Sequence, residues 1–243
     1  MIAAILIGRK GSKGFPNKNI YKIGTKMLFE YPLTECKKSK SINEIYVSTD
    51  SEVIKKKSQK YGVKFIERPK KLNDSKALGD DVFHYVANKI IKRNKDIEFF
   101  VLLFANSATL TSKMLDNAIK VIKKNPKADS IVSVSKYNMW SPLRARKINS
   151  KGYLDPFVKF EYFGNPKTLN CDRDAQGDVY YADMSFSIVR PRCFKNMSNN
   201  LLPQKWMGKK ILPYYSEAGL DVDYEWQIPQ LKFWIKNLKR KKI

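Results

Sequence analysis

Cysteine and histidine are scarce in this chain, and long apolar runs are missing from it. Three cysteines occur among 243 residues, namely Cys36, Cys171 and Cys193. Because they are widely spaced, they indicate neither a disulfide framework nor a zinc site, and we interpret them as packing residues. The only histidine, His84, falls in an amphipathic helical pattern. A lone helix histidine is more often a surface or packing residue than a catalytic base, so we exclude it from the candidate site.

No apolar stretch is long enough to span a bilayer. The apolar run at residues 2–7 is too short for a secretion signal, and no basic region precedes it. We therefore expect a cytoplasmic protein without a membrane span. With 43% hydrophobic and 12% aromatic residues, the chain can bury one substantial core. We expect a single domain over residues 1–243, with any additional structure inserted within it.

Acidic residues are few compared with basic ones: 47 Lys and Arg against 23 Asp and Glu give a formal net charge of +24. A charge of this size is compatible with nucleic-acid binding. However, lysines recur in every segment, and the chain has no evident recognition helix or aromatic platform for single strands. We therefore interpret the charge as a basic solvated surface that attracts anionic substrates, with no specific nucleic-acid partner. A basic nucleic-acid-binding protein is kept as an alternative.

Apolar, β-branched segments alternate with amphipathic helical patterns. The strand-like segments are residues 2–7, 45–48, 63–66, 99–104 and 130–134, followed by 184–189 and 210–215. The helical patterns are residues 27–38, 51–60, 80–91 and 112–124, and a last one after Pro229. Pro32 is tolerated in the first of these only near a first turn or at a kink. The alternation predicts an α/β fold with a doubly wound, mostly parallel sheet, whose ligands bind beyond the carboxyl ends of the strands.

Residues 140–182 break this rhythm. The segment is rich in Gly, Pro, Asn and aromatic residues and lacks a long periodic element. Many of its apolar side chains have no helix or strand of their own. We predict an inserted arm or lobe within the domain, with a simple cover over the core as the alternative.

The strand at residues 2–7 leads into a loop punctuated by glycine, residues 8–19, with the sequence GRKGSKGFPNKN. Glycine lets the backbone approach an anion closely, and successive N–H groups in such a turn form an anion-binding nest. Arg9, Lys10, Lys13 and Lys18 add cationic donors for phosphate oxygens. The loop predicts a phosphate site, although it matches neither common phosphate-loop motif. A solvated basic turn is the alternative.

Two carboxylates near the end of the chain extend this hypothesis to a metal. Asp221 and Asp223 are two residues apart, which places both side chains on one face of an extended chain. Mg²⁺ usually takes one or two carboxylates together with substrate phosphates. We predict a Mg²⁺ site at Asp221 and Asp223, with an acidic helix N-terminus before Trp226 as the alternative.

Taken together, these segments resemble the acylneuraminate cytidylyltransferase family, the enzymes that make CMP-sialic acid and its relatives. The loop at residues 9–19 resembles the family's CTP-binding loop, with Lys10 where the family usually has glycine. Residues 46–50 (YVSTD) resemble its second strand. Arg68-Pro69 together with residues 72–81 resembles its nucleotide-lining segment, and residues 221–223 (DVD) resemble its metal-binding pair. The resemblance implies a nucleotide-diphospho-sugar transferase-like fold with an inserted dimerisation arm, and hence a homodimer.

The resemblance also implies roles for individual residues. Arg9, Lys13 and Lys18 would hold the triphosphate of CTP, and Asp221 and Asp223 would hold Mg²⁺. The catalytic set is then Arg9, Lys13, Lys18 and Asp221. The implied nucleotide-binding residues are Gly8, Arg9, Lys10, Gly11, Ser12, Lys13, Gly14, Lys18, Asn19, Arg68 and Asp74.

The acceptor half departs from the family pattern. Residues 102–110 (LLFANSATL) replace the family's Leu-Leu-Gln-Pro-Thr-Ser-Pro-Leu-Arg, and residues 183–187 (DMSFS) replace its Asn-Gly-Ala-Ile-Tyr. We expect an anionic acceptor that the sequence does not identify further. The candidate acceptor-binding residues are Asn106, Ser107, Arg144, Arg173 and Asp183.

These expectations combine into one function. We expect a nucleotidyltransferase that uses CTP and Mg²⁺ to convert a sialic-acid-like nonulosonate into its CMP derivative, with release of pyrophosphate, for cell-surface polysaccharide synthesis. One alternative is the same chemistry on an octulosonic acid or a phosphonate. The others are the nucleic-acid-binding protein and an inactive relative.

Overall fold

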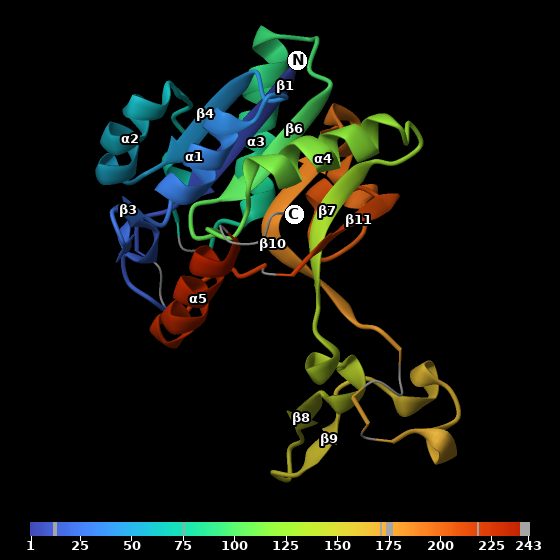
Figure 1. The fold of residues 1–243 in the computed structure, drawn as a ribbon. Coiled ribbons are helices and arrows are strands. Elements are labelled where there is room, and N and C mark those ends of the chain that lie inside the picture. Colours follow the sequence, from blue (N-terminus) through green and yellow to red (C-terminus); the bar gives the residue numbers. More distant parts are fainter. Residues whose placement is uncertain (12–13, 75, 171, 174–176, 218, 239–243) are drawn as a thin grey trace.

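A seven-stranded sheet with the strand order β11-β7-β10-β6-β1-β4-β5 forms the centre of the molecule (Figure 1). The structure is a computed structural model, and it describes residues 1–243 except 12–13, 75, 171, 174–176, 218 and 239–243. The strands are β1 (Ile2–Gly8), β4 (Glu44–Thr49), β5 (Lys64–Phe65), β6 (Phe99–Phe104), β7 (Ser130–Lys136), β10 (Tyr180–Val189) and β11 (Ile211–Ser216). Neighbouring strands are parallel, except that β10 runs antiparallel to β6 and β7. The predicted α/β fold with a mostly parallel sheet is confirmed.

Continuous apolar sequence explains why the central strands are buried on both faces. All seven residues of β1 are buried, as are the first five residues of β6. Strand β10 begins at Tyr180 rather than at the predicted Met184, whereas the other strands of this sheet begin within one residue of their predicted starts. Its first three residues are exposed and show no apolar alternation. They belong to the predicted inserted segment, residues 140–182, and form the part of β10 next to the lobe.

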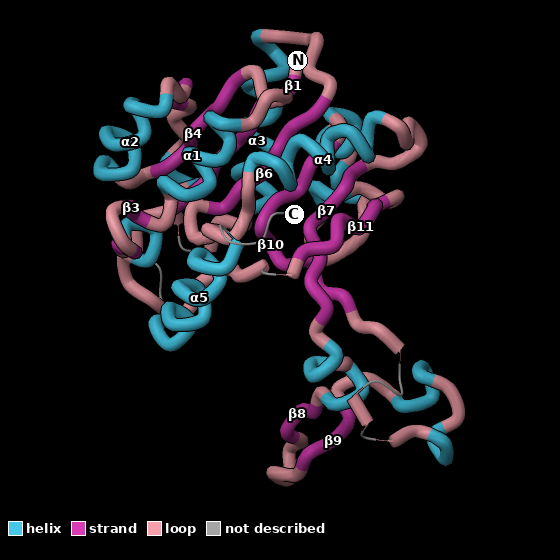
Figure 2. Tube along the Cα trace, in the orientation of Figure 1, coloured by secondary structure: helices cyan, strands magenta, loops and turns pink. Residues whose placement is uncertain are grey.

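Helices cover both faces of the sheet (Figure 2). They are α1 (Glu30–Lys38), α2 (Glu52–Ser58), α3 (Gly79–Arg93), α4 (Ser112–Lys123) and α5 (Ile228–Leu238). Side chains of α1, α2 and α4 share one core cluster with β1 and β6, whereas α3 packs in a second cluster on the opposite face. None of the helices in the described ranges is long and apolar enough to cross a membrane.

Local sequence signals explain where the helices begin. The hydroxyl of Ser51 accepts a hydrogen bond from the backbone N–H of Ile54 at the start of α2, and Thr111 does the same for Met114 at the start of α4. Pro32 lies in the first turn of α1, where its missing N–H costs no helical hydrogen bond. This is why α1 begins at Glu30 and not at residue 27.

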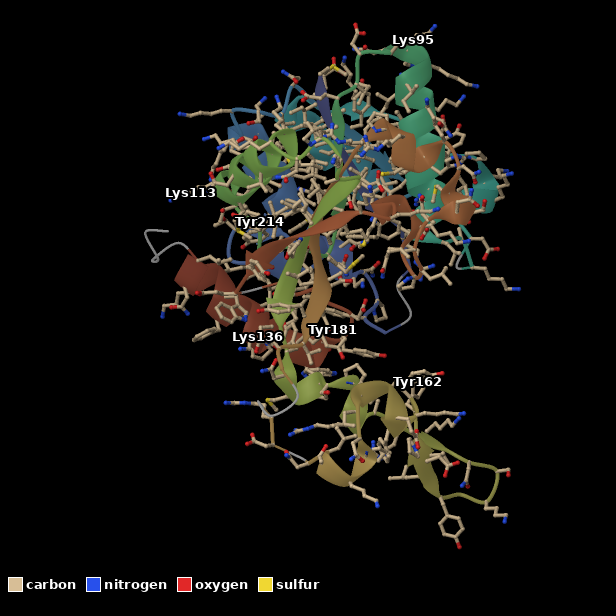
Figure 3. All side chains as sticks on the ribbon, turned by 90° about the vertical axis from the view of Figure 1, so that its right-hand side faces the viewer. Lys95, Lys113, Lys136, Tyr162, Tyr181 and Tyr214 are labelled. Atoms are coloured by element: carbon tan, nitrogen blue, oxygen red, sulfur yellow. The ribbon has the colours of Figure 1, made fainter. Side chains whose placement is uncertain are left out.

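A separate lobe hangs below the sheet on the extended ends of β7 and β10 (Figure 1). It contains the hairpin of β8 (Arg146–Ile148) and β9 (Leu154–Pro156) and short 3-10 turns. Figure 3 shows Lys136 and Tyr181 at the neck and Tyr162 within the lobe. A second hairpin, β2 (Lys22–Ile23) with β3 (Lys26–Met27), follows the glycine loop on the other side of the molecule.

The last helix covers the segment that carries the two aspartates. Leu231 of α5 is fully buried in a third cluster together with Phe15, Leu28, Leu220 and Val222. This cluster joins the glycine loop to residues 220–222. The C-terminal helix therefore packs two distant parts of the predicted site against each other.

A substitution of Phe29 tests the packing on the face of the sheet that α1, α2 and α4 cover. Its ring is fully buried in the same cluster as the side chains of Leu6 and Leu115. Phe29→Ala is expected to lower the free energy of unfolding, measured by urea denaturation, by about 3–5 kcal/mol. Phe233→Ala is the matched control, because that ring is 59% exposed on α5. A loss for Phe29→Ala no greater than that of the control would contradict this description of the core.

Glu30 tests a buried carboxylate at the start of α1. It accepts hydrogen bonds from the backbone N–H of Met27 (2.8 Å) and the hydroxyl of Tyr61 (3.1 Å), and Lys60 lies 2.6 Å away. Burial raises its pKa, but the hydrogen bonds from Lys60, Met27 and Tyr61 together outweigh burial, so the pKa lies below the ordinary value of 4.5. The charged form of Glu30 therefore favours the folded state.

The stabilisation from Glu30 is present above the pKa of the unfolded chain and is lost as the pH falls through the lower folded pKa. We expect the difference in unfolding free energy between wild type and Glu30→Gln to be constant above about pH 6 and to shrink below about pH 4.5. Urea denaturation over a pH series measures it. Glu161→Gln, in the lobe, controls for the change in net charge. A difference that grows on acidification would refute the assignment.

Candidate active site

A cavity of about 500 Å³ lies at the carboxyl ends of β1 and β6. This is the position at which parallel α/β sheets bind ligands, because the loops that follow neighbouring strands meet there. Ten of the predicted site residues line this one cavity: Gly8, Arg9, Gly14, Lys18, Asn19, Arg68, Asp74, Asn106, Asp221 and Asp223. They come from five separate segments of the chain.

The remaining predicted residues lie elsewhere. Lys10 and Gly11 belong to the glycine loop but do not line the cavity. Ser12 and Lys13 fall outside the described residues, so their nucleotide role stays a prediction. Ser107 is fully buried beside the cavity and forms an isolated antiparallel bridge with Asp221.

Close backbone packing fixes the start of the glycine loop. A Cβ atom on Gly8 would lie 2.7 Å from the Cβ of Ala105, so only glycine fits where β1 and β6 end side by side. Further along, the side-chain amide of Asn19 donates a hydrogen bond of 3.0 Å to the backbone carbonyl of Arg9. The buried Asn19 thus ties the two ends of the loop together. From the sequence, only a role in nucleotide binding was predicted for Asn19.

Asp50 is a site-building residue to which the sequence reasoning assigned no role. Its Oδ1 accepts hydrogen bonds from the backbone N–H of Lys10 (2.7 Å) and from Nη2 of Arg68 (3.0 Å). Arg68 also donates to the carbonyl of Gly8 (3.1 Å) and to Oδ1 of Asn73 (2.6 Å). Burial lowers the pKa of Arg68, and the charge of Asp50 opposes that shift. A carboxylate directly after a buried strand was the signal available in the sequence.

The two aspartates meet the glycine loop across the cavity. Lys18 forms an ion pair with Asp223. The amide of Asn106 donates hydrogen bonds to Oδ1 of Asp221 and to the carbonyl of Val222 (2.9 Å). The site therefore places cationic and anionic side chains on facing walls.

Asp221 occupies an electrostatically unfavourable position. Burial first and the neighbouring charge of Asp223 second raise its pKa to about 6, although Lys18 opposes the shift. A divalent cation would relieve both the burial and the repulsion. Two hard carboxylate oxygens suit Mg²⁺, which takes its other ligands from phosphates and water. In the described part of the chain no group of three or more His, Cys, Asp or Glu side chains forms a metal site by itself. The residues fit a metal held jointly with a nucleotide.

Of the five predicted acceptor-binding residues, Asn106 lines the cavity and Ser107 is buried beside it, whereas the other three lie elsewhere. Arg144 lies in the lobe and borders a separate cavity there, and Arg173 is exposed in the same lobe. Asp183 is 7% exposed, and its two carboxylate oxygens accept hydrogen bonds from Ser133 and Ser135. Asp183 lies in an irregular stretch of β10, and no sequence pattern indicated that its carboxylate is held by β7.

The structure adds cavity residues that the sequence did not single out. Lys76 supplies a further cation, and Leu78 and Phe104 provide an apolar wall at the start of α3. Tyr224 lies next to Asp223 and contacts the position where a Cβ atom of Gly14 would be, 3.1 Å away. Gly14 is therefore needed for the glycine loop to approach the aspartate segment.

Comparison with known proteins gives one consistent family. The profile of the cytidylyltransferase family matches residues 3–232. The N-acylneuraminate cytidylyltransferase of Escherichia coli is 31% identical over 224 residues, which are 91% of this chain and 49% of that protein. The CMP-N,N'-diacetyllegionaminic acid synthase of Legionella pneumophila is 31% identical over 190 residues, 74% of this chain and 77% of that protein.

A two-activity protein of Helicobacter pylori also matches part of the chain. It is named pseudaminic acid cytidylyltransferase and UDP-2,4-diacetamido-2,4,6-trideoxy-beta-L-altropyranose hydrolase, and it is 32% identical over 143 residues, 58% of this chain and 27% of that protein. The chain thus spans about a quarter of this relative, and about half of the Escherichia coli relative.

Solved structures show the same fold at low sequence identity. A CMP:2-keto-3-deoxy-manno-octonic acid synthetase complexed with CTP superposes with a TM-score of 0.69 at 14% identity, covering 97% of this chain and 98% of the other. The 4-diphosphocytidyl-2C-methyl-D-erythritol synthase of Anaerococcus prevotii gives a TM-score of 0.64 at 12% identity, covering 97% and 96%. With a profile match over residues 3–232 and the fold described above, this chain belongs to the cytidylyltransferase family.

Proposed function

We propose that the protein transfers CMP from CTP to a hydroxyl group of a nonulosonic sugar acid, with Mg²⁺ as cofactor and pyrophosphate as the second product. One observation supports this most directly: a single cavity brings Arg9 and Lys18 of the glycine loop opposite Asp221 and Asp223. Cations for a triphosphate and carboxylates for a metal are the two parts that this chemistry requires. Relatives named for sialic, legionaminic and pseudaminic acids support the acceptor class.

The residues of the cavity would act mainly by positioning and by balancing charge. Arg9, Lys18 and, by prediction, Lys13 hold the phosphate oxygens of CTP, while Arg68 and Asp50 keep the loop in place. Asp221 and Asp223 hold Mg²⁺. When bound, the metal neutralises phosphate charge and lowers the pKa of a coordinated hydroxyl group. The acceptor oxygen forms a bond to the α-phosphorus and releases its proton to solvent. The bond between the α-phosphorus and the oxygen that bridges it to the β-phosphorus breaks, and pyrophosphate leaves with that electron pair.

The lobe supports a homodimer as part of the proposal. Several of its large apolar side chains are exposed, and apolar side chains gathered on a surface mark sites of protein association. They are Met139, Trp140, Ile148, Tyr153, Leu154, Phe157 and Tyr162. In such a dimer we assign Arg144 and Arg173 of the lobe a role toward an acid acceptor. We place this activity in the cytoplasm.

An assay of pyrophosphate release tests the function. We expect release only with CTP among the four nucleoside triphosphates, only with Mg²⁺, and with one member of a panel of sialic, legionaminic, pseudaminic and octulosonic acids. Release with the octulosonic acid alone would favour the alternative acceptor. Salt-sensitive binding of DNA or RNA without CTP binding would favour the nucleic-acid alternative.

Asp221 tests the mechanism. Asp221→Asn removes one metal-binding charge but keeps an oxygen that accepts the hydrogen bond from Asn106. We expect kcat at saturating CTP to fall on the order of 10²–10³-fold, with little change in thermal stability. Glu225→Gln is the control, because it removes the same charge four residues further along and outside the cavity. Equal kcat values for wild type and Asp221→Asn would show that Asp221 does not hold the metal.

A further inference from the structure

Strand β10 contains an irregularity close to the active site. Its pairing with β7 shifts between Ala182 and Ser187. Within this stretch Met184 has a φ of 59°, a left-handed conformation that costs energy for any residue with a side chain other than Asn or Asp. Asp183 lies in the same stretch, directly before Met184.

The Asp183 carboxylate is fully engaged inside the protein. It accepts hydrogen bonds from the hydroxyls of Ser133 (2.5 Å) and Ser135 (2.6 Å) on β7 and from the backbone N–H of Ser185 (3.0 Å). At 7% exposure these bonds replace those that water would make. A buried charge held in this way fixes the geometry of everything that packs against it.

Gly219 packs directly against this carboxylate. A Cβ atom on Gly219 would lie 1.9 Å from Cγ of Asp183, so no other residue fits. The N–H of Gly219 donates to the hydroxyl of Ser135 (3.2 Å), and its carbonyl accepts from the hydroxyl of Tyr137 (2.9 Å). Ser135 therefore connects Asp183 to Gly219 through one hydroxyl group.

The connection continues to the metal-site aspartate. Residue 220 follows Gly219, and the N–H of Leu220 donates to the hydroxyl of Thr109 (3.2 Å). Asp221 then meets the amide of Asn106. Three successive residues, 219 to 221, are thus each attached to a different point of the framework. The position of Asp221 depends on all three attachments.

We propose that Asp183 is a positioning residue for the active site: through Ser135 and Gly219 it sets where Asp221 presents its carboxylate to the metal. It does not touch the reacting groups. This inference rests on the proposed function in one respect, the role of Asp221 in metal binding. The anchoring of residues 219–221 by Asp183 is a separate claim about the protein alone.

Two serine variants separate this role from general stability. Ser133→Ala and Ser135→Ala each remove one hydroxyl bond to Asp183, but only Ser135→Ala breaks the link to Gly219. Both are made in the full chain, with thermal unfolding recorded for each. The first readout is amide hydrogen exchange at residues 219–221. The second is Mn²⁺ binding followed by electron paramagnetic resonance, in the presence of CTP and without an acceptor.

We expect Ser135→Ala to speed amide exchange at Gly219 and Leu220 and to weaken Mn²⁺ binding on the order of 10-fold, as for other residues that orient a metal ligand. Ser133→Ala should leave both readouts within about two-fold of wild type. Asp183→Asn, where it folds, should resemble Ser135→Ala.

Wild-type exchange and Mn²⁺ affinity in Ser135→Ala would overturn the proposal. Equal losses in Ser133→Ala and Ser135→Ala would also overturn it, because the effect would then be loss of stability in the sheet. If the wild-type chain binds no Mn²⁺ with CTP, the proposed metal site itself is wrong. Exchange at residues 219–221 then still decides whether Asp183 anchors that segment.

Discussion

The close approach of β1 and β6 at their carboxyl ends is the constraint on which the site depends. Gly8 lies against Ala105 without room for a side chain, so the glycine loop and the Asn106 turn start from adjacent points. Because both strands are buried and parallel, neither end can move independently of the sheet. The position of the cavity is therefore set by the packed core. The loops that follow the strands supply the side chains of the site.

Buried polar groups then determine the position of each wall. Asp50 and Arg68 hold the backbone of the glycine loop on one side, and the Asp183 network holds the aspartate segment on the other. Arg68 and Asp183 are buried, so their hydrogen bonds replace those that water would make and fix the geometry around them. The pKa of Asp221, raised to about 6 by burial first and by Asp223 second, shows the cost of bringing these groups together.

The net charge of +24 can be explained by the attraction of anionic substrates to the protein, without a nucleic-acid partner. Lysines on nearly every surface segment raise the local concentration of anions, and both proposed substrates are anions. Specificity has to come from the few side chains in the cavity, since the charge is spread over the whole molecule. The lobe, with its exposed aromatic residues, is separated from the sheet by the extended ends of β7 and β10.

The sequence by itself determined the central sheet, the helices and half of the residues that line the cavity. Apolar β-branched runs and helical periodicity are local signals, and the glycine loop and the aspartate pair follow them as recognisable motifs. Only the tertiary structure decided the roles of Asp50 and Asp183. Their side-chain partners lie 18 to 50 residues away, for example Arg68 for Asp50 and Ser133 for Asp183. Asp183 was expected at the acceptor, but its carboxylate is engaged by Ser133 and Ser135 of β7 and does not line the cavity, and no periodic pattern in the sequence indicates these contacts. The roles of Asp50 and Asp183 thus depend on contacts across the fold and not on their neighbours in the chain.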